Sequence, residues 1–170
     1  VDVFGYAGDF NLYDCNRDKN FCNNGLVNPD RELNPHADEV GYIHQSIWSE
    51  LVSPKSSRVT IYNEYTFINL DKFKLEWNIM VDGDVVRSGE LLNLNVPAGE
   101  RRTVDLGYSL TGIDLSKEVL LNIDYKLKSG EPLLAAGTRL AKAQLEIAAY
   151  TGYHNDVVYS RPDQEAYVTL

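Results

Sequence analysis

Apolar and polar side chains alternate in short runs from about residue 38 onward. In the clearest run, residues 73–81, every second side chain is apolar: Phe73, Leu75, Trp77, Ile79 and Val81. A period of two residues is typical of a β-strand with one buried face, so Trp77 is predicted to lie in the core. Asp82-Gly83-Asp84 then has the turn chemistry of a β-hairpin, and we expect a second strand from Val85.

The same alternation predicts further strands on both sides of this hairpin. These are expected at 42–48, at 58–67, through Val104 and Leu106, at 118–127 and at 138–147, with turns at 97–100 and at Gly137. No stretch of useful length repeats at helical spacing. About seven or eight short strands joined by turns favour an all-β fold, an immunoglobulin-like antiparallel β-sandwich.

The two ends of the chain lack this pattern. Residues 1–37 and residues 150–170 read as irregular N- and C-terminal arms around a sandwich at 38–149. The first residues have no Met and no signal-peptide features, which indicates a cut inside a longer protein. The two cysteines, Cys15 and Cys22, are expected to be free thiols, with a local bridge as the alternative.

Charge and hydropathy argue against several kinds of partner. The 170 residues carry a formal net charge of −9, and the longest basic cluster is the pair Arg101-Arg102. Nucleic acids and anionic membranes bind concentrated positive charge, so neither is expected as a partner. No apolar run approaches the roughly 18 residues of a membrane span. We expect a soluble protein, and the sequence does not choose between cytoplasm and periplasm.

A search for catalytic chemistry finds one tempting pair, Asn63-Glu64, since many glycosidases carry their acid on Asn-Glu. Here Glu64 falls on the polar side of an alternating run and is expected to face solvent. The three histidines, His36, His44 and His154, have no partner at metal-ligand spacing. Eleven Tyr and two Trp would suit a sugar-binding surface, but most occupy alternating strand positions. The sandwich is therefore expected to contain no catalytic residue.

A series of motifs runs through the arm and the sandwich. Gly-Asp-Phe at 8–10 is followed by Asn-Phe-Cys-Asn-Asn-Gly-Leu at 20–26 and a Pro-His stretch. Further characteristic stretches lie at 28–47, 62–91, 96–100 and 137–147. The series resembles the junction between the catalytic barrel and the fourth domain in β-galactosidases of glycoside hydrolase family 2. The resemblance spans nearly the whole chain.

This resemblance implies a role for each segment. Residues 1–37 would be the C-terminal remnant of the barrel, 38–149 the immunoglobulin-like fourth domain, and 150–170 an exit segment leading to the next domain. Family enzymes hydrolyse terminal β-D-galactosyl residues with retention by means of two Glu side chains. Both would precede Val1, so the fragment alone is expected to be inactive.

The resemblance also implies site residues and cofactors for the parent enzyme. Phe21 would pack at the galactose pocket, and its carbonyl and the side-chain oxygen of Asn24 would bind sodium. Magnesium is implied for the parent as well, and no cofactor is implied for the isolated fragment. The implied partners are the remaining domains and the galactoside substrate, while a homo-oligomer is left open.

We therefore interpret the chain as a non-catalytic β-sandwich fragment of a β-galactosidase, with scaffolding and active-site-rim roles. One alternative is a stand-alone carbohydrate-binding module, which would need an exposed aromatic platform or a concave sheet face. Another is a structural immunoglobulin-like domain of a surface protein. Without the barrel, Phe21, Leu26 and Val27 are expected to dock on the sandwich or on a neighbouring molecule. The preferred galactoside, the oligomeric state and the compartment stay undetermined.

Overall fold

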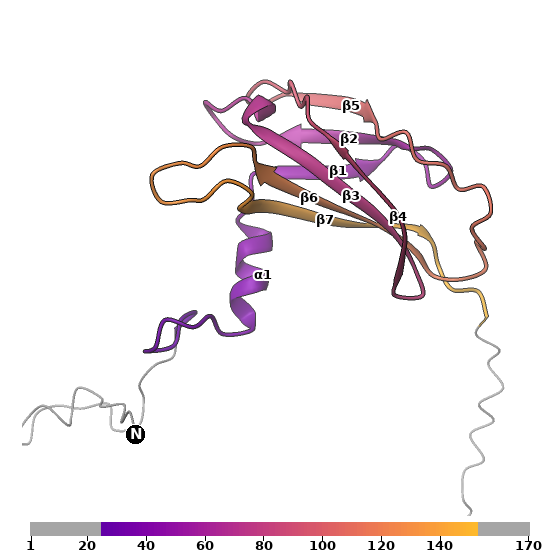
Figure 1. Ribbon diagram of the computed structural model, residues 1–170, viewed down its shortest axis with the longest axis horizontal. Coiled ribbons are helices and arrows are strands. Elements are labelled where there is room, and N and C mark those ends of the chain that lie inside the picture. The colour runs from indigo at the N-terminus through magenta and orange to yellow at the C-terminus, as the bar shows by residue number, and fades with distance from the viewer. Residues whose placement is uncertain (1–24, 153–170) are drawn as a thin grey trace, which may run out of the picture.

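A computed structural model describes residues 25–152. Most of its regular elements are β-strands, and few residues are helical (Figure 1). The strands are β1 (Ile47–Leu51), β2 (Arg58–Asn63), β3 (Phe73–Val81), β4 (Asp84–Leu91), β5 (Arg101–Asp105), β6 (Val119–Leu127) and β7 (Arg139–Ala148). The helical elements in this range are α1 (His36–Ile43) and a short 3₁₀ helix, η2 (Leu70–Lys72).

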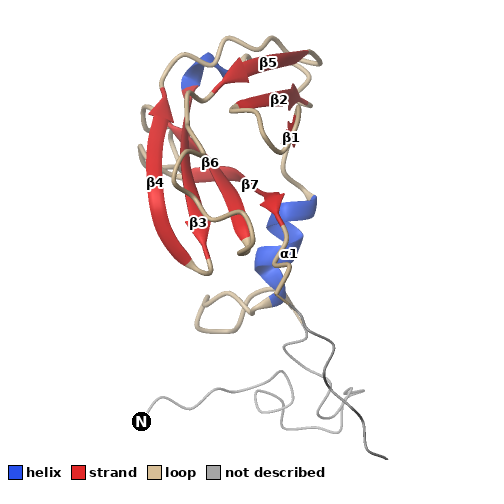
Figure 2. Ribbon diagram, turned by 90° about the vertical axis from the view of Figure 1, so that its right-hand side faces the viewer, coloured by secondary structure: helices blue, strands red, loops and turns tan. Residues whose placement is uncertain are grey.

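The strands form two antiparallel sheets that face each other (Figure 2). One sheet has the order β1-β2-β5 and the other the order β4-β3-β6-β7. All pairings between neighbouring strands are antiparallel. The predicted all-β, immunoglobulin-like sandwich is therefore confirmed.

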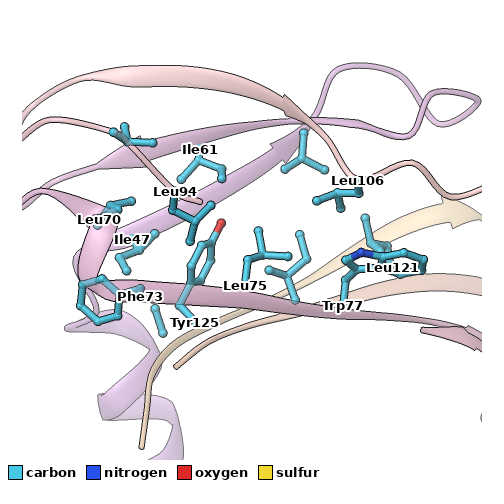
Figure 3. Packing of buried hydrophobic residues seen from close by; sticks show 14 of the residues in the cluster. Ile47, Ile61, Leu70, Phe73, Leu75, Trp77, Leu94, Leu106, Leu121 and Tyr125 are labelled. Atoms are coloured by element: carbon cyan, nitrogen blue, oxygen red, sulfur yellow. The ribbon is translucent and has the colours of Figure 1, made fainter. Parts of the chain in front are cut away.

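The core lies between the two sheets, where the inward side chains of each strand meet (Figure 3). Trp77 is only 8% exposed, and Leu75 and Ile79 beside it on β3 are fully buried, which confirms the predicted face. Gly89 is the partner of Trp77 across the β3–β4 pair, and the Trp77 indole lies over it. A Cβ built on Gly89 would stand only 2.5 Å from the indole ring. Glycine at this position therefore makes room for the largest core side chain.

A buried hydroxyl pair joins the two sheets. Tyr125 of β6 is fully buried, and its phenol oxygen lies 2.6 Å from Oγ of Ser49 on β1. Burial raises the pKa of Tyr125 above its ordinary value, so the phenol is neutral at physiological pH. Because a buried hydroxyl without a partner is costly, this contact favours one relative position of the sheets.

The predicted turns are confirmed with a small shift. Asp82 and Gly83 have φ of 49° and 92°, the left-handed values that the two central residues of a tight hairpin need. The second strand of the hairpin begins at Asp84, one residue earlier than expected. Gly137 also has a positive φ, 84°, in the turn that leads into β7.

The prediction of one strand at 42–48 is wrong. Residues up to Ile43 belong to α1, and β1 starts only at Ile47. The helix follows a proline, and its first turn holds Asp38 and Glu39, as the start of a helix favours. The helix has eight residues, and none of them is buried. Such a short helix shows no repeat of apolar residues from which it could be predicted. The expected segment boundary between residues 37 and 38 falls inside this helix.

The predicted strand at 58–67 is too long. Strand β2 ends at Asn63, after which the chain leaves the sheet. Tyr65 is partly buried, where its ring stacks on Phe73 with the ring centroids 6.1 Å apart. Phe67, the last residue of the predicted strand, is 93% exposed. The alternation of apolar residues thus continues in the sequence beyond the point where the strand ends.

Candidate functional site

The residues assigned to the sugar and sodium sites, Phe21 and Asn24, lie outside the described residues. The same is true of Cys15, Cys22 and His154. Within residues 25–152, no three side chains of His, Cys, Asp or Glu lie together in a way that could hold a metal ion. Over the same range, no helix has the length and apolar character needed to cross a membrane. The roles of Phe21 and Asn24 thus stay predictions.

A short loop connects the start of the described chain to α1. Val27 and Leu33 form an isolated antiparallel bridge within it. Leu33 is 70% exposed, and Leu26 and Val27 are exposed as well. Leu26 and Val27 are therefore not buried in this structure, and their docking on the sandwich or on a neighbouring molecule stays a prediction. We call residues 25–46, which comprise this loop, α1 and the link to β1, the lead-in.

Asn63 is fully buried and lies at the centre of a cluster of loops. Its Nδ2 donates hydrogen bonds to the carbonyls of Ile68, at 2.7 Å, and Val96, at 2.8 Å. Its Oδ1 accepts a hydrogen bond from the backbone N–H of Tyr65 at 3.1 Å. Because both donor hydrogens and the oxygen are engaged, the role of this side chain is structural.

Glu64 is exposed, as predicted. Its carboxylate accepts a hydrogen bond from Nε1 of Trp48 at 2.7 Å. The sequence pair Asn63-Glu64 therefore consists of a buried structural amide and a surface carboxylate held by an indole. Retaining glycosidases need two carboxyl groups on opposite sides of the scissile bond, and Glu64 alone does not provide that arrangement.

Several other carboxylates are stabilised in their charged form. A hydrogen bond from Lys126 is the main cause that lowers the pKa of Glu76. Hydrogen bonds from neighbouring serine hydroxyls are the main cause of the lowered pKa of Asp105 and of Asp114. A general acid that works near neutral pH needs a raised pKa, so these three residues are unsuited to that role.

Polar side chains on the outer face of the four-stranded sheet pair with one another. Asn122 of β6 donates to Oδ1 of Asn78 at 2.9 Å and accepts from Nε2 of Gln144 at 2.8 Å. Beside this amide row, Arg139 and Asp124 form an ion pair at 3.2 Å. Side chains that satisfy one another in this way are typical of a solvated sheet face.

An aromatic row crosses the outer face of the three-stranded sheet. Tyr42 of α1 meets Trp48 of β1 edge to face, with ring centroids 5.8 Å apart, and Trp48 is the cross-strand partner of Tyr62. The Arg101 guanidinium lies 4.2 Å from the centroid of the Tyr62 ring. Sugar stacking needs free aromatic faces, whereas these rings contact one another or a cation. Sequence reasoning missed the row because its members come from three separate elements.

Comparison with known proteins assigns the sandwich to a family. A family model described as "Beta-galactosidase, domain 4" matches residues 59–148, from the second residue of β2 to the last residue of β7. The chain belongs to this family. The resemblance seen in the sequence motifs is thereby confirmed, and the matched residues include strands β3 to β7 and most of β2.

Individual β-galactosidases match beyond the sandwich. The chain is 30% identical over 154 residues to a β-galactosidase of Clostridium acetobutylicum, covering 91% of this chain and 16% of the relative. It is 32% identical over 147 residues to a β-galactosidase of Photobacterium profundum, covering 85% and 14%. β-Galactosidase 2 of Enterobacter cloacae is also 32% identical over 147 residues, covering 86% and 14%. The chain thus spans about a sixth or less of these relatives.

Proposed function

We propose that the chain is part of a longer β-galactosidase, in which it supplies the non-catalytic fourth domain and the segment that enters it. The match of residues 59–148 to the domain 4 family carries this proposal. Relatives align over 85–91% of the chain, so their similarity includes residues outside the sandwich. A scaffolding role fits a domain that fills its own core and pairs its own surface carboxylates and amides.

The alternative of a stand-alone carbohydrate-binding module has less support. The aromatic row of Tyr42, Trp48 and Tyr62 has the residue types of a sugar platform, but its faces are partly covered. Phe67 is exposed by itself on the loop after β2. A scaffold needs neither of these surfaces to be free, and we therefore favour it.

The first test concerns catalysis by the chain alone. Both catalytic Glu residues of the proposed enzyme would lie outside this chain, so incubation with a chromogenic β-galactoside should give only background hydrolysis. The Glu64→Gln variant serves as the control, since Glu64 is the one carboxylate in an Asn-Glu pair. Hydrolysis above background that disappears in this variant would contradict the proposal.

The second test concerns the rim of the active site in the full-length enzyme. Phe21 would contribute its side chain to the galactose pocket and its carbonyl to sodium, and Asn24 would add a side-chain oxygen. Carbonyl and amide oxygens are ligands that hard cations accept. Asn24→Ala should weaken both hydrolysis and its dependence on sodium while unfolding in urea is unchanged. Asn23→Ala is the matched control, and full sodium response in Asn24→Ala would show that the assignment is wrong.

A further inference from the structure

One end of the sandwich carries α1 together with two loops (Figure 1). Helix α1 leads into β1, whose first residue, Ile47, pairs with Asn63 at the end of β2. The loop at 64–72, which includes η2, follows β2, and the loop at 128–138 follows β6. Both loops lie at this end because the last residue of β6 pairs with the first residue of β3. We call it the entry end.

Two large apolar side chains at the entry end are almost completely exposed. Phe67 in the first loop is 93% exposed, and Leu133 in the second loop is 95% exposed. Within residues 25–152, the next most exposed large apolar side chain is Leu33, at 70%. Single apolar side chains are common at protein surfaces, but two of this size on adjoining loops indicate a contact site.

The two loops are held in place by contacts with each other and with the core. The backbone N–H of Lys128 donates a hydrogen bond to the carbonyl of Lys72 at 3.0 Å, and Lys72 forms an ion pair with Glu131 at 2.5 Å. The residue after each exposed side chain is anchored as well. Leu134 packs against the core, and the carbonyl of Ile68 accepts a hydrogen bond from a buried amide. The exposed side chains are therefore presented by fixed backbone.

A groove of about 270 Å³ lies at the same end, between α1 and the start of β7 (Figure 2). Leu33 and Gly41 line it on the lead-in side, and Leu140 lines it on the β7 side. Gln45, also in the lining, is only 6% exposed, and its Oε1 accepts a hydrogen bond from the backbone N–H of Lys142 at 2.8 Å. Among the described residues, its buried Nε2 has no hydrogen-bond partner. Buried amide donors are normally paired, so this atom indicates that an acceptor from elsewhere belongs here.

The length of the connection decides which partner reaches the entry end. In the proposed enzyme, residues 1–37 are the end of the catalytic barrel, so this inference rests on the proposed function. The barrel is then joined to β1 mainly by α1, whose eight residues are roughly 12 Å long. So short a link keeps the body of the barrel beside the entry end, at an effective concentration that a free second copy does not reach. The segment after β7 instead leaves from the opposite end, roughly 33 Å along that strand.

We propose that the body of the preceding domain, the catalytic barrel of the proposed enzyme, packs against the entry end. Phe67 and Leu133 insert into its surface, and the barrel supplies the acceptor for Gln45 Nε2 in the groove. Interfaces between domains of one chain typically bury roughly 600–1,500 Å², and a few large side chains carry most of the binding energy. The contact fixes the orientation of the barrel on the sandwich, which a single short helix does not do alone.

The reactivity of introduced thiols tests this contact. Phe67→Cys, Leu133→Cys and Gly41→Cys place one thiol on each loop and one in the groove, where a Cβ at Gly41 meets no atom within 4 Å. Ser88→Cys is the control, because Ser88 is exposed in the middle of β4, away from the entry end. Each variant is made in the 170-residue chain and in the full-length enzyme. Alkylation by iodoacetamide is followed at each site by mass spectrometry of digests, which separates the introduced thiol from native cysteines.

Alkylation at the three entry-end sites should be at least about tenfold slower in the full-length enzyme than in the chain alone, because a covered site reacts only when the contact opens. The rate at Ser88→Cys should be the same in both proteins. Equal rates in the two proteins at Phe67→Cys and Leu133→Cys would overturn the proposal, and equal rates at Gly41→Cys would overturn its statement about the groove. Equal protection of Ser88→Cys would also overturn it, since the covered surface would then not be the entry end.

A photo-crosslink identifies the partner, and it replaces the thiol test if a cysteine variant does not fold by circular dichroism. p-Benzoylphenylalanine in place of Phe67 keeps an aromatic ring at this position of the full-length enzyme. Irradiation should link it to barrel residues of the same polypeptide. Links between two polypeptides, links to a domain that follows β7, or no link would each overturn the proposal. The proposed function fails instead if the reading frame encodes no barrel before this segment, so the two failures are distinguishable.

Discussion

Two buried side-chain amides in this molecule have opposite surroundings. Asn63 makes three hydrogen bonds, and all of its partners belong to the sandwich and its loops. Gln45 makes one to Lys142 and keeps a buried donor that no described residue pairs. The first lies where the chain packs on itself, and the second where the lead-in meets the sandwich edge. The amide within the sandwich is thus fully paired, whereas the amide at the junction with the lead-in keeps one donor that no described residue pairs.

Apolar side chains show the same contrast. Trp77 is 8% exposed and Leu75 is fully buried within the sandwich, while Leu33 in the lead-in is 70% exposed. Ile43 at the end of α1 is exposed as well. Large apolar side chains grouped at a surface usually mark a contact site. No residue of α1 is buried, so the lead-in leaves its apolar side chains open to contact, as the sandwich does in loops such as those of Phe67 and Leu133.

The largest effect is expected in the core of the sandwich. Trp77→Ala removes a buried indole that covers Gly89, and it should lower the free energy of unfolding by about 3–5 kcal/mol. Phe67→Ala is the matched control, because Phe67 is also a large aromatic residue but is 93% exposed. Urea denaturation of both variants measures the difference. Equal urea midpoints for the two variants would mean that Trp77 is not part of a closed core.

The contrast between the amides gives the next largest effect. Asn63→Ala leaves the carbonyls of Ile68 and Val96 without a side-chain donor and should cost about 2–3 kcal/mol. Gln45→Met keeps a similar volume and removes a single described hydrogen bond, so we expect about 1 kcal/mol. Both values come from the same urea titrations. If Gln45→Met costs as much as Asn63→Ala, the two amides are equally embedded and the comparison fails.

The smallest effect concerns the ion pairs on the sheet surface. The pKa of Glu76 is lowered in the folded chain, chiefly by Lys126, so Glu76 contributes stability above the unfolded pKa and loses it as pH falls through the folded pKa. Its side chain is 33% exposed, so Glu76→Gln should cost only about 0.5 kcal/mol near pH 7. The cost should be smaller at pH 3 than at pH 7, because Glu76 is increasingly protonated as pH falls through its folded pKa, and urea unfolding at both pH values measures the difference. A cost that stays constant with pH would exclude the carboxylate charge as its origin.

Much of the sandwich could be predicted from local sequence. The period of two residues in 73–81 and 118–127 identified the buried faces of β3 and β6, since a strand turns alternate side chains to opposite sides. Asp82-Gly83 identified the hairpin, because few residues accept positive φ at both turn positions. The exposure of Glu64 followed from the same alternation. The motifs indicated the β-galactosidase family, which the match over 59–148 confirms.

Tertiary structure alone decided the contacts that define the lead-in and the sheet packing. Tyr125 meets Ser49 across 76 positions of sequence, and Gln45 meets Lys142 across 97. No periodic pattern connects such residues, because their proximity depends on how the two sheets and α1 pack. The groove beside Gln45 likewise arises from elements that are distant in sequence. Local alternation fixes which way a side chain points on a strand, but only packing determines which residue it meets.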